Sequence, residues 1–394
     1  MGIYLDYAAT TYIDERVLEA MKPYFSKDFG NPGSFHDMGL KAKEAVENAR
    51  VIVAEALNAK PEEIIFTGSG TESINLAIKG VARAMKEKGK HIITSKIEHH
   101  AVIDSCEYLK KEEGFEVTYL DVGRDGIVNL EQLKGAIKKE TILITIMYAN
   151  NEIGTIQPIE EIGRIAKANG IYFHTDACQA TEYLEMNVEK LNADLMSING
   201  SKIYGPKGTG ALYVRKGVKI KPIIHGGGQE FGLRSGTENV PGIVGFGKAV
   251  EIAAAEKKSE NERLTELREM LIKGLVERIP KTILNGHPTK RLPNNVNVSI
   301  LDVEGEAVLL HLNQKGIYAS TGSACTSQSL EPSHVIMALG MPYEVSHGSL
   351  RFSLGKKTTK EHIKKVLKVL PPIVKKLREL SPVKLEVEEV MSNK

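Results

Sequence analysis

The chain has 394 residues, 42% of them hydrophobic, so it can bury a full core and is expected to form one large domain and a smaller one. Lysine and arginine total 52 against 50 acidic residues, and the net charge of +2 argues against direct binding of nucleic acid. The chain has no apolar run of membrane-spanning length and no charged-then-apolar leader, which predicts a cytoplasmic protein that does not enter membranes. Its three cysteines are odd in number and lack metal-ligand spacing, so neither a disulfide framework nor a metal site is expected.

The first half of the chain alternates between predicted strands and helices. Apolar runs predict strands at residues 63–67, 91–95, 115–122, 141–148 and 193–198. Apolar residues at helical spacing predict helices at residues 42–57, 72–85 and 159–168. Strands that are regularly separated by helices indicate a parallel sheet with right-handed crossovers, and hence an α/β fold.

A turn of small residues, Gly-Ser-Gly-Thr at positions 68–71, joins the first of these strands to its helix. Backbone N–H groups at a helix start suit a phosphate, and Ser69 and Thr71 would add hydroxyl groups. An ordinary helix cap by serine or threonine has the same composition, so the turn alone leaves both interpretations open. Its glycines match neither a Walker loop nor the GxGxxG pattern, which argues against a nucleotide site.

Five polar residues lie closely after predicted strands. They are His99, Asn151, Asp176, Gln179 and Lys202; Asp176 and Gln179 belong to the segment at residues 170–179, which follows the helix predicted at residues 159–168 and continues the alternation. Open α/β sheets bind ligands at the carboxyl ends of their strands. The repetition therefore predicts a single site at that edge of the sheet.

Lys202 lies in a glycine-bearing segment directly after a buried strand. A partly desolvated lysine in such a place can form a Schiff base with a carbonyl cofactor such as pyridoxal phosphate. Asp176 would keep the pyridine nitrogen of that cofactor protonated, and His99 would lie flat against its ring. Taken singly, a solvated lysine, a helix-capping aspartate and a surface histidine remain the alternatives.

A glycine-rich segment at residues 225–239 contains Arg234 and Thr237 and is predicted to be a flexible loop that favours anions rather than core structure. A long helix is predicted after it and is expected to lead into a second domain. Its apolar face is formed by Leu264, Leu267, Leu271 and Leu275.

The C-terminal part has a different pattern. Alternating residues predict a half-exposed strand at residues 295–300 and another strand at residues 350–354, and residues 304–312 are predicted to be helical. Cys325 lies between these elements in a run of Ser, Thr, Gly and Ala, which is typical of a mobile polar loop. This segment alone leaves open whether Cys325 is a working thiol or a chance loop cysteine.

The last long helix is predicted to begin at a capping box, Thr358 with Glu361. Pro371 and Pro372 are expected to kink or break it. The tail at residues 383–394 is charged, a composition that favours disorder.

Taken together, these motifs resemble those of the cysteine desulfurases, pyridoxal-phosphate enzymes of the class V aminotransferase type that supply sulfur for iron-sulfur clusters. The resemblance covers nearly the whole chain. The matching segments begin at Leu5, Thr67, Glu98, Asn150, Asp176, Lys202, His225, Arg234, Ser323 and Arg351. It implies the fold type I of pyridoxal-phosphate transferases. A large domain at residues 16–258 would hold a mainly parallel sheet flanked by helices, and residues 1–15 and 259–394 would form a smaller α+β domain with the catalytic cysteine loop.

The resemblance implies conversion of L-cysteine to L-alanine, with transfer of the sulfur to an enzyme cysteine as a persulfide. Lys202 resembles the lysine that binds the cofactor covalently, Asp176 the partner of the ring nitrogen, and His99 the stacked residue implicated in proton transfer. Arg351 resembles the clamp for the substrate carboxylate, and Cys325 the thiol that takes the sulfur. A sulfur-acceptor or cluster-scaffold protein is the implied partner.

Further positions match residues that hold the cofactor. Gly70 and Thr71 resemble ligands of its phosphate, while Gln179 and Asn151 resemble polar contacts around the ring hydroxyl and the substrate. Thr237 resembles a hydroxyl that reaches the phosphate from the other subunit of a homodimer.

Asn199 and Ser201 depart from the family pattern, which has serine and histidine at these phosphate-holding positions. Both residues can still form hydrogen bonds, but a positive charge beside the phosphate is lost, so weaker cofactor retention is one expectation. The alternatives are a selenocysteine lyase or a transaminase on the same fold, and a scaffold in cluster assembly that holds little cofactor. A tRNA-linked cysteine-forming enzyme also fits the fold, but it would need a basic groove that this composition does not indicate.

Overall fold

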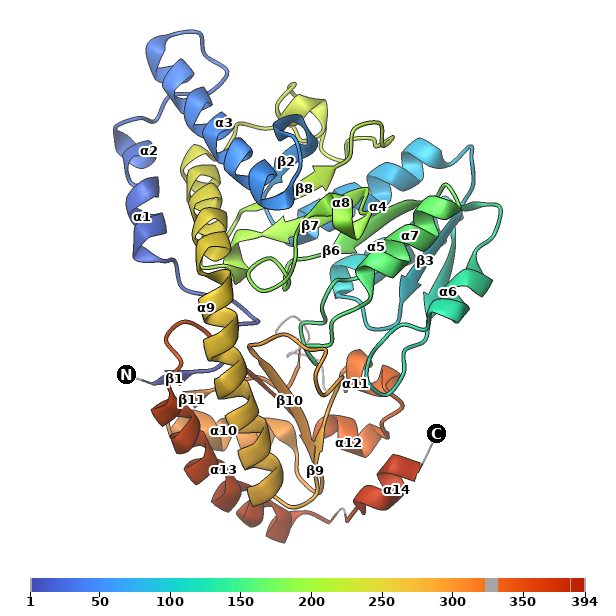
Figure 1. Ribbon diagram of the computed structural model, residues 1–394, viewed down its shortest axis with the longest axis vertical. Coiled ribbons are helices and arrows are strands. Elements are labelled where there is room, and N and C mark those ends of the chain that lie inside the picture. The colour runs from blue at the N-terminus through green and yellow to red at the C-terminus, as the bar shows by residue number, and fades with distance from the viewer. Residues whose placement is uncertain (1, 323–331, 383, 393–394) are drawn as a thin grey trace.

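The computed structural model describes residues 2–322, 332–382 and 384–392, which form a large sheet with flanking helices and a smaller α+β part below it (Figure 1). The central sheet has seven strands in the order β2-β8-β7-β6-β5-β3-β4. Their bounds are β2 Ile64–Thr67, β8 Gly210–Val214, β7 Leu195–Asn199, β6 Tyr172–Asp176, β5 Thr141–Thr145, β3 His91–Ser95 and β4 Glu116–Leu120. Only β8 runs antiparallel to its neighbours in this sheet. The mainly parallel α/β sheet predicted from the sequence is confirmed.

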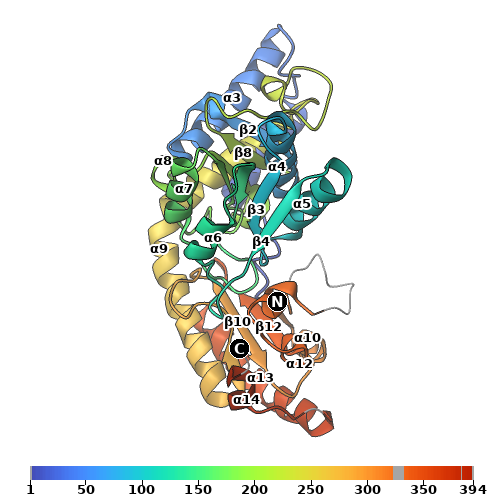
Figure 2. The same ribbon diagram turned by 90° about the vertical axis from the view of Figure 1, so that its right-hand side faces the viewer.

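Helices cover both faces of the central sheet, which explains why its inner strands are continuous apolar runs. α4 (Gly70–Met85) and α5 (His100–Glu113) pack on one face, and α7 (Ile159–Ala168) and the first half of α9 (Val240–Arg278) on the other (Figure 2). The remaining helices of this part are α1 Glu15–Met21, α2 Pro23–Ser26, α3 Asp37–Leu57, α6 Leu130–Ala136 and α8 Val188–Leu191.

The smaller part is built on a three-stranded antiparallel sheet, β12-β10-β9, and a parallel pair, β1-β11. Its strands are β1 Ile3–Tyr4, β9 Thr282–Leu284, β10 Asn295–Ile300, β11 Ile317–Tyr318 and β12 Ser349–Ser353. Its helices are α10 Gly305–Gln314, α11 His334–Ala338, α12 Tyr343–His347, α13 Lys360–Leu380 and α14 Val387–Ser392. The N-terminal strand therefore belongs to the same part as the C-terminal third of the chain, because it pairs with β11.

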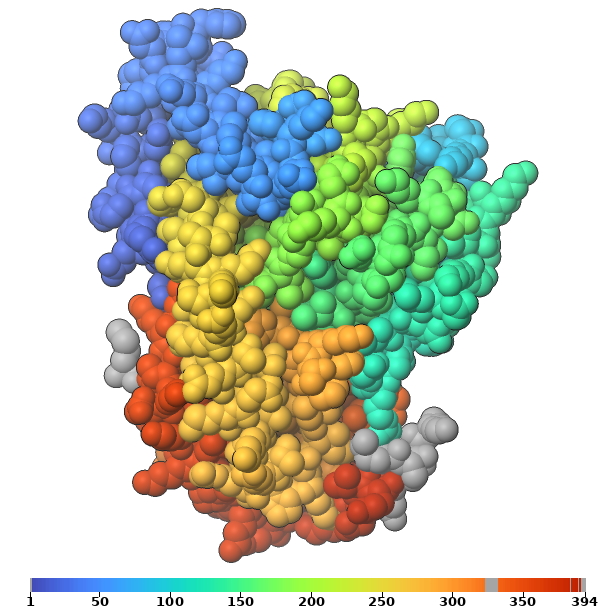
Figure 3. Space-filling view, viewed as in Figure 1, coloured from blue at the N-terminus to red at the C-terminus, as the bar shows by residue number. Residues whose placement is uncertain are grey.

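The 39-residue helix α9 connects the two parts and runs along one face of the molecule (Figure 3). Its first half packs in the core of the large sheet, and the predicted leucine face packs in the core of the small one. Because α9 passes through residue 258 without interruption, the domain limits 16–258 and 1–15 with 259–394 stay a prediction. Among the residues that the structure describes, no helix is long and apolar enough to cross a bilayer.

The strand predicted at residues 295–300 exists as β10, but the expectation that it is half-exposed is wrong, since all six residues are buried. One of its faces packs in the apolar core of the small part. Its polar face meets the large part instead of solvent: Asn295 and Asn297 donate to the backbone oxygen of Glu152 at 3.0 and 3.1 Å.

The last long helix, α13, also differs from its prediction. Its cap is Thr359, which accepts from the backbone N–H of His362, whereas Thr358 accepts from Gly355. α13 is not broken at the prolines. A proline at position 371 frees the carbonyl of Leu367, and Arg278 of α9 donates to that oxygen at 3.4 Å.

The tail is ordered over α14, which contradicts the expected disorder for these residues. Val390 is 2% exposed, and its carbonyl accepts from Arg124 at 2.9 Å. Glu386 pairs with Lys281 at 2.8 Å. The charged composition therefore serves contacts with the rest of the protein rather than solvation alone.

The glycine-rich segment at residues 225–239 is largely irregular, as predicted, but it contributes to the core. Glu230 is 6% exposed and forms a buried ion pair with Arg50 at 2.7 Å. Its carboxylate also accepts from the backbone N–H of Phe66 in β2 at 2.8 Å. The prediction that this segment stays outside the core is therefore wrong at Glu230.

Candidate active site

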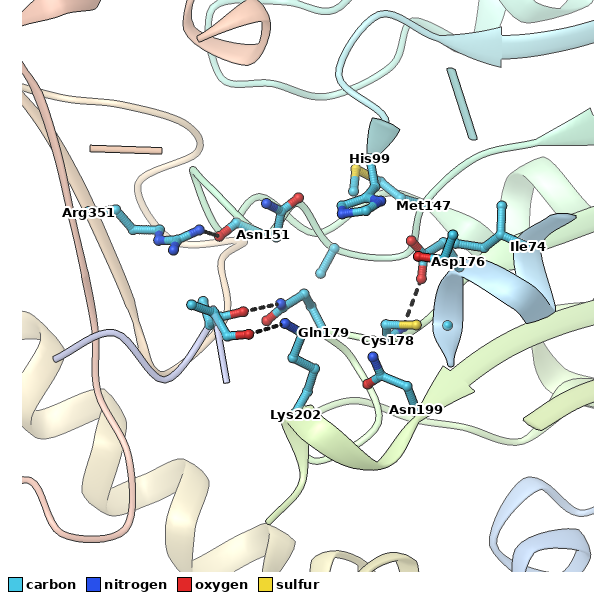
Figure 4. Close-up of a pocket in the computed structure, with 15 residues that line it drawn as sticks. Ile74, His99, Met147, Asn151, Asp176, Cys178, Gln179, Asn199, Lys202 and Arg351 are labelled. Atoms are coloured by element: carbon cyan, nitrogen blue, oxygen red, sulfur yellow. Dashed lines mark hydrogen bonds between the residues drawn. The ribbon is translucent and has the colours of Figure 1, made fainter. Parts of the chain in front are cut away.

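A pocket lies at the carboxyl edge of the central sheet, where β6 and β7 end (Figure 4). Its residues enclose an empty volume of about 620 Å³, which includes the open mouth of the pocket. Its lining residues are Ala8, Ala9, Gly70, Thr71, Ile74, His99, Met147, Ala149, Asn151, Asp176, Cys178, Gln179, Asn199, Lys202 and Arg351. The five polar residues found after predicted strands all lie in this one pocket.

Lys202 reaches the pocket from the turn after β7. The chain leaves the strand at Asn199 and forms one short helical turn, Gly200–Lys202. The Lys202 Nζ donates to the backbone oxygen of Ala9 at 2.5 Å. The amine is thus held at the pocket by the N-terminal segment, which comes from the other end of the chain.

Asp176 is the last residue of β6 and is 7% exposed. Its Oδ1 accepts from the backbone N–H of Cys178 at 3.0 Å, which fixes the carboxylate at the strand end. The residue therefore presents a buried negative charge in the pocket (Figure 4).

His99 caps α5, and its Nδ1 accepts from the backbone N–H of Ala101 at 3.0 Å. Since Nδ1 accepts a hydrogen bond, the proton of the neutral ring is on Nε2.

The neighbouring Glu98 is fully buried, and burial raises its pKa to about 8. Both oxygens of Glu98 accept from the backbone N–H of the pocket residue Met147, each at 3.0 Å.

The turn at residues 68–71 is both a helix cap and part of the pocket. Ser69 Oγ accepts from the backbone N–H of Glu72 at 3.1 Å, so the capping interpretation is correct. Gly70 and Thr71 nevertheless line the pocket at the start of the 16-residue helix α4. The Oδ1 of Asn199 is buried there without a hydrogen-bond partner among the described residues.

The start of α4 has the features that a phosphate site requires. The N-terminus of a long helix favours an anion, and the Thr71 hydroxyl can donate to it. Rotating the Asn199 amide by half a turn would present its N–H donors. A Cβ at position 70 would lie 2.6 Å from the Cys178 sulfur and 3.3 Å from Asn199 Nδ2, so glycine keeps this corner open. With Lys202 and Asp176, the residues fit pyridoxal phosphate.

The opposite side of the pocket carries a buried cation. Arg351, on β12 of the small sheet, is 1% exposed. Its Nη1 donates to the backbone oxygen of Asn151 at 3.1 Å and its Nη2 to Asp6 Oδ1 at 2.8 Å. Its Nε is buried without a hydrogen-bond partner among the described residues. Such an arginine suits a carboxylate ligand.

Three predicted site residues are not part of this pocket as described. Ser201 has its backbone carbonyl bound by the N–H of Thr11, and its side chain does not line the pocket. Thr237 is exposed and lines a separate hollow with Arg234. Cys325 lies outside the described residues.

Cys178 is a pocket residue that was not predicted from the sequence. Its thiol is buried, and burial together with the Asp176 carboxylate raises its pKa well above the ordinary value. It is therefore a neutral packing residue and no nucleophile. Its position two residues after Asp176 was the available signal, because both lie at the same strand end.

The chain matches the model of the family described as "Aminotransferase class-V" over residues 3–366. It is 59% identical over 381 residues to the cysteine desulfurase IscS of Methanosarcina thermophila, a match that covers 97% of this chain and 94% of that protein. A solved structure titled "NIFS-LIKE PROTEIN" superposes with a TM-score of 0.88 at 40% identity, covering 96% of this chain and 99% of the other. Another, titled "SspA in complex with cysteine", has a TM-score of 0.80 at 42% identity and covers 89% and 98% of the two chains.

The fold and the pocket thus define a fold type I enzyme of the pyridoxal-phosphate-dependent class V aminotransferases. Within that class, the chain belongs to the IscS-type cysteine desulfurases, enzymes that release sulfur from cysteine for iron-sulfur cluster assembly.

Proposed function

We propose that this chain binds pyridoxal 5'-phosphate in the pocket around Lys202 and uses it to convert L-cysteine to L-alanine, with Cys325 taking the sulfur for an acceptor or cluster-scaffold protein. The observation that carries the proposal is the meeting of Lys202, Asp176 and Arg351 in one pocket. An amine for the cofactor carbonyl, a carboxylate for its ring nitrogen and a cation for the substrate carboxylate are the three groups that this chemistry needs.

The cofactor, when bound, supplies an electron sink for the carbon skeleton of the substrate. Gly70, Thr71 and Asn199 would hold its phosphate at the start of α4, with Gln179 beside the ring. Gln179 is oriented by a hydrogen bond from its Nε2 to the Ala8 carbonyl at 2.9 Å. The predicted phosphate role of Ser201 rests on the resemblance alone.

Proton transfer falls to two groups. Lys202 accepts and returns the proton at Nζ, and His99 acts through Nε2, because its Nδ1 is engaged by the backbone. Arg351 and Asn151 orient the substrate through its carboxylate.

The sulfur of the substrate moves to Cys325 in one displacement. The thiolate of Cys325 attacks the sulfur of the substrate, and an S–S bond forms while the Cβ–S bond breaks. The electron pair of the broken bond stays with the carbon skeleton, which takes up a proton and leaves as alanine. The persulfide on Cys325 then passes its outer sulfur to the acceptor.

We further propose a homodimer in which Thr237 completes the phosphate site of the partner subunit. The support is its exposed position outside the pocket of its own chain. The cytoplasmic location predicted from the sequence belongs to the same proposal, since free buried thiols such as Cys106 and Cys178 suit a reducing compartment.

Absorbance and product measurements on the purified protein test the proposal. With pyridoxal phosphate it should show visible absorbance and release sulfide and alanine in equal amounts from L-cysteine. Borohydride reduction should attach the cofactor at Lys202. Attachment at Lys207 would contradict the assignment. Visible absorbance without sulfide release would point to a transaminase, and a protein without visible absorbance would point to a scaffold that holds little cofactor.

A further inference from the structure

Arg351 is a buried cation that already has a carboxylate partner. Among the ion pairs of the described residues, its one carboxylate partner is Asp6, with Nη2 and Oδ1 2.8 Å apart. The arginine side chain is 1% exposed and that of Asp6 is 20% exposed. The pair offsets the cost of burying the guanidinium where no substrate is bound.

Asp6 is fixed by its own backbone. Its carbonyl accepts from the Tyr4 hydroxyl and from the N–H of Ala9, each at 3.0 Å. It also forms a bridge with Ser353, two residues beyond Arg351 on the small sheet. The turn directly after Asp6 supplies the carbonyls that hold Gln179 and Lys202. Asp6 therefore lies directly behind the pocket-lining residue Arg351 and is held in place there by its backbone.

A ligand carboxylate that binds at Arg351 meets both an attractive and a repulsive charge. A guanidinium has five N–H donors, so a bound carboxylate finds free donors beside those used by Asp6 and Asn151. The positive charge, however, is already shared with Asp6. A second carboxylate at the same guanidinium is attracted by Arg351 and repelled by Asp6.

We propose that Asp6 is a positioning residue that orients Arg351 and, through its charge, weakens the hold of the site on α-carboxylates, so that substrate and product are both released more easily. The inference rests on the proposed role of Arg351 as the carboxylate clamp. It separates two effects of one side chain: the oxygen that accepts from Nη2 fixes geometry, and the negative charge lowers affinity.

The experiment titrates L-alanine into the holoenzyme and monitors the visible spectrum. Asp6→Asn keeps an oxygen acceptor but removes the charge, and we expect its Kd for L-alanine to fall about tenfold, the scale of a like charge about 6 Å away at an effective dielectric constant of about 40 for the partly exposed Asp6. Asp6→Glu keeps the charge and must not tighten binding. Cysteamine, which has no carboxylate, should bind the wild type and Asp6→Asn alike. Asp14→Asn is the matched control, because Asp14 pairs with Arg16 in the same N-terminal region outside the pocket lining.

The outcomes are distinct. Tighter L-alanine binding in Asp6→Asn alone supports the inference, and if that variant does not fold, Asp6→Ser serves as a smaller neutral acceptor. Unchanged or weaker binding in Asp6→Asn, with a clear loss in Arg351→Gln, overturns the role of Asp6 and leaves the clamp intact. Unchanged binding in Arg351→Gln overturns the clamp itself, and with it the proposed function of Arg351.

Discussion

Substitution of Gly70 by alanine tests how closely the phosphate corner of the pocket is packed. The added methyl group would lie 2.6 Å from the Cys178 sulfur and 3.3 Å from Asn199 Nδ2. Contacts under 3 Å force neighbours to move, and overpacking of this kind costs about 1–3 kcal/mol. Cys178 is buried and Asn199 is partly buried, so the strain should fall on the turn that is proposed to hold the phosphate. We expect Gly70→Ala to lower the free energy of unfolding by about 2 kcal/mol and to weaken cofactor binding about tenfold or more.

The assay is urea unfolding of the cofactor-free protein at fixed concentration, together with titration of pyridoxal phosphate monitored by visible absorbance. The double variant Gly70→Ala with Cys178→Ala removes the sulfur that the methyl group meets, and it should recover about 1 kcal/mol relative to the sum of the single changes. Gly135→Ala in α6 is the control, because no atom lies within 4 Å of its added Cβ, and it should be neutral or stabilising. A Gly70→Ala protein as stable as the wild type, or a double variant without recovery, would refute the reasoning.

Three further predictions test the remaining groups. Cys325→Ala should keep the visible absorbance and still bind cysteine but lose sulfide release by about a hundredfold or more, with mass spectrometry finding added sulfur only on Cys325 of the wild type. Mixed subunits of Lys202→Ala and Thr237→Ala should regain activity if Thr237 serves the partner site; no gain despite verified subunit exchange would contradict the shared site. Burial raises the pKa of Glu98 to about 8 from 4.5, so the stability that this group contributes at low pH is lost as pH rises through that range. Glu98→Gln should remove a slope of about 1.4 kcal/mol per pH unit there, as measured by chemical unfolding at several pH values.

The central sheet and most of the pocket could be predicted from the sequence because both arise from local patterns. Strand and helix periods locate the elements, and parallel strands bring the residues at their carboxyl ends to one edge of the sheet. That is why His99, Asp176 and Lys202 were found together. The same reasoning applied to Cys178 would have placed it in the pocket as well.

The features that the sequence did not show depend on contacts between distant segments. Asp6 and Arg351 are 345 residues apart, and no local pattern pairs them. The alternating sequence of β10 predicts a half-exposed strand, because polar residues form one of its faces. In the structure the large part of the molecule covers that face, which no local pattern shows. A proline pair predicts a helix break unless another helix offers a donor such as Arg278.

The N-terminal segment shows why the site needs both parts of the molecule. The central sheet alone supplies Asp176 and the lysine, yet the Lys202 amine is held by the Ala9 carbonyl and Gln179 by the Ala8 carbonyl. That segment is in turn anchored in the small part, where β1 pairs with β11 and Asp6 binds Arg351. Groups toward the cofactor and groups toward the substrate carboxylate are thus joined through one turn of the chain. Arg351 and Lys202 are therefore connected by four residues of backbone, from Asp6 to Ala9.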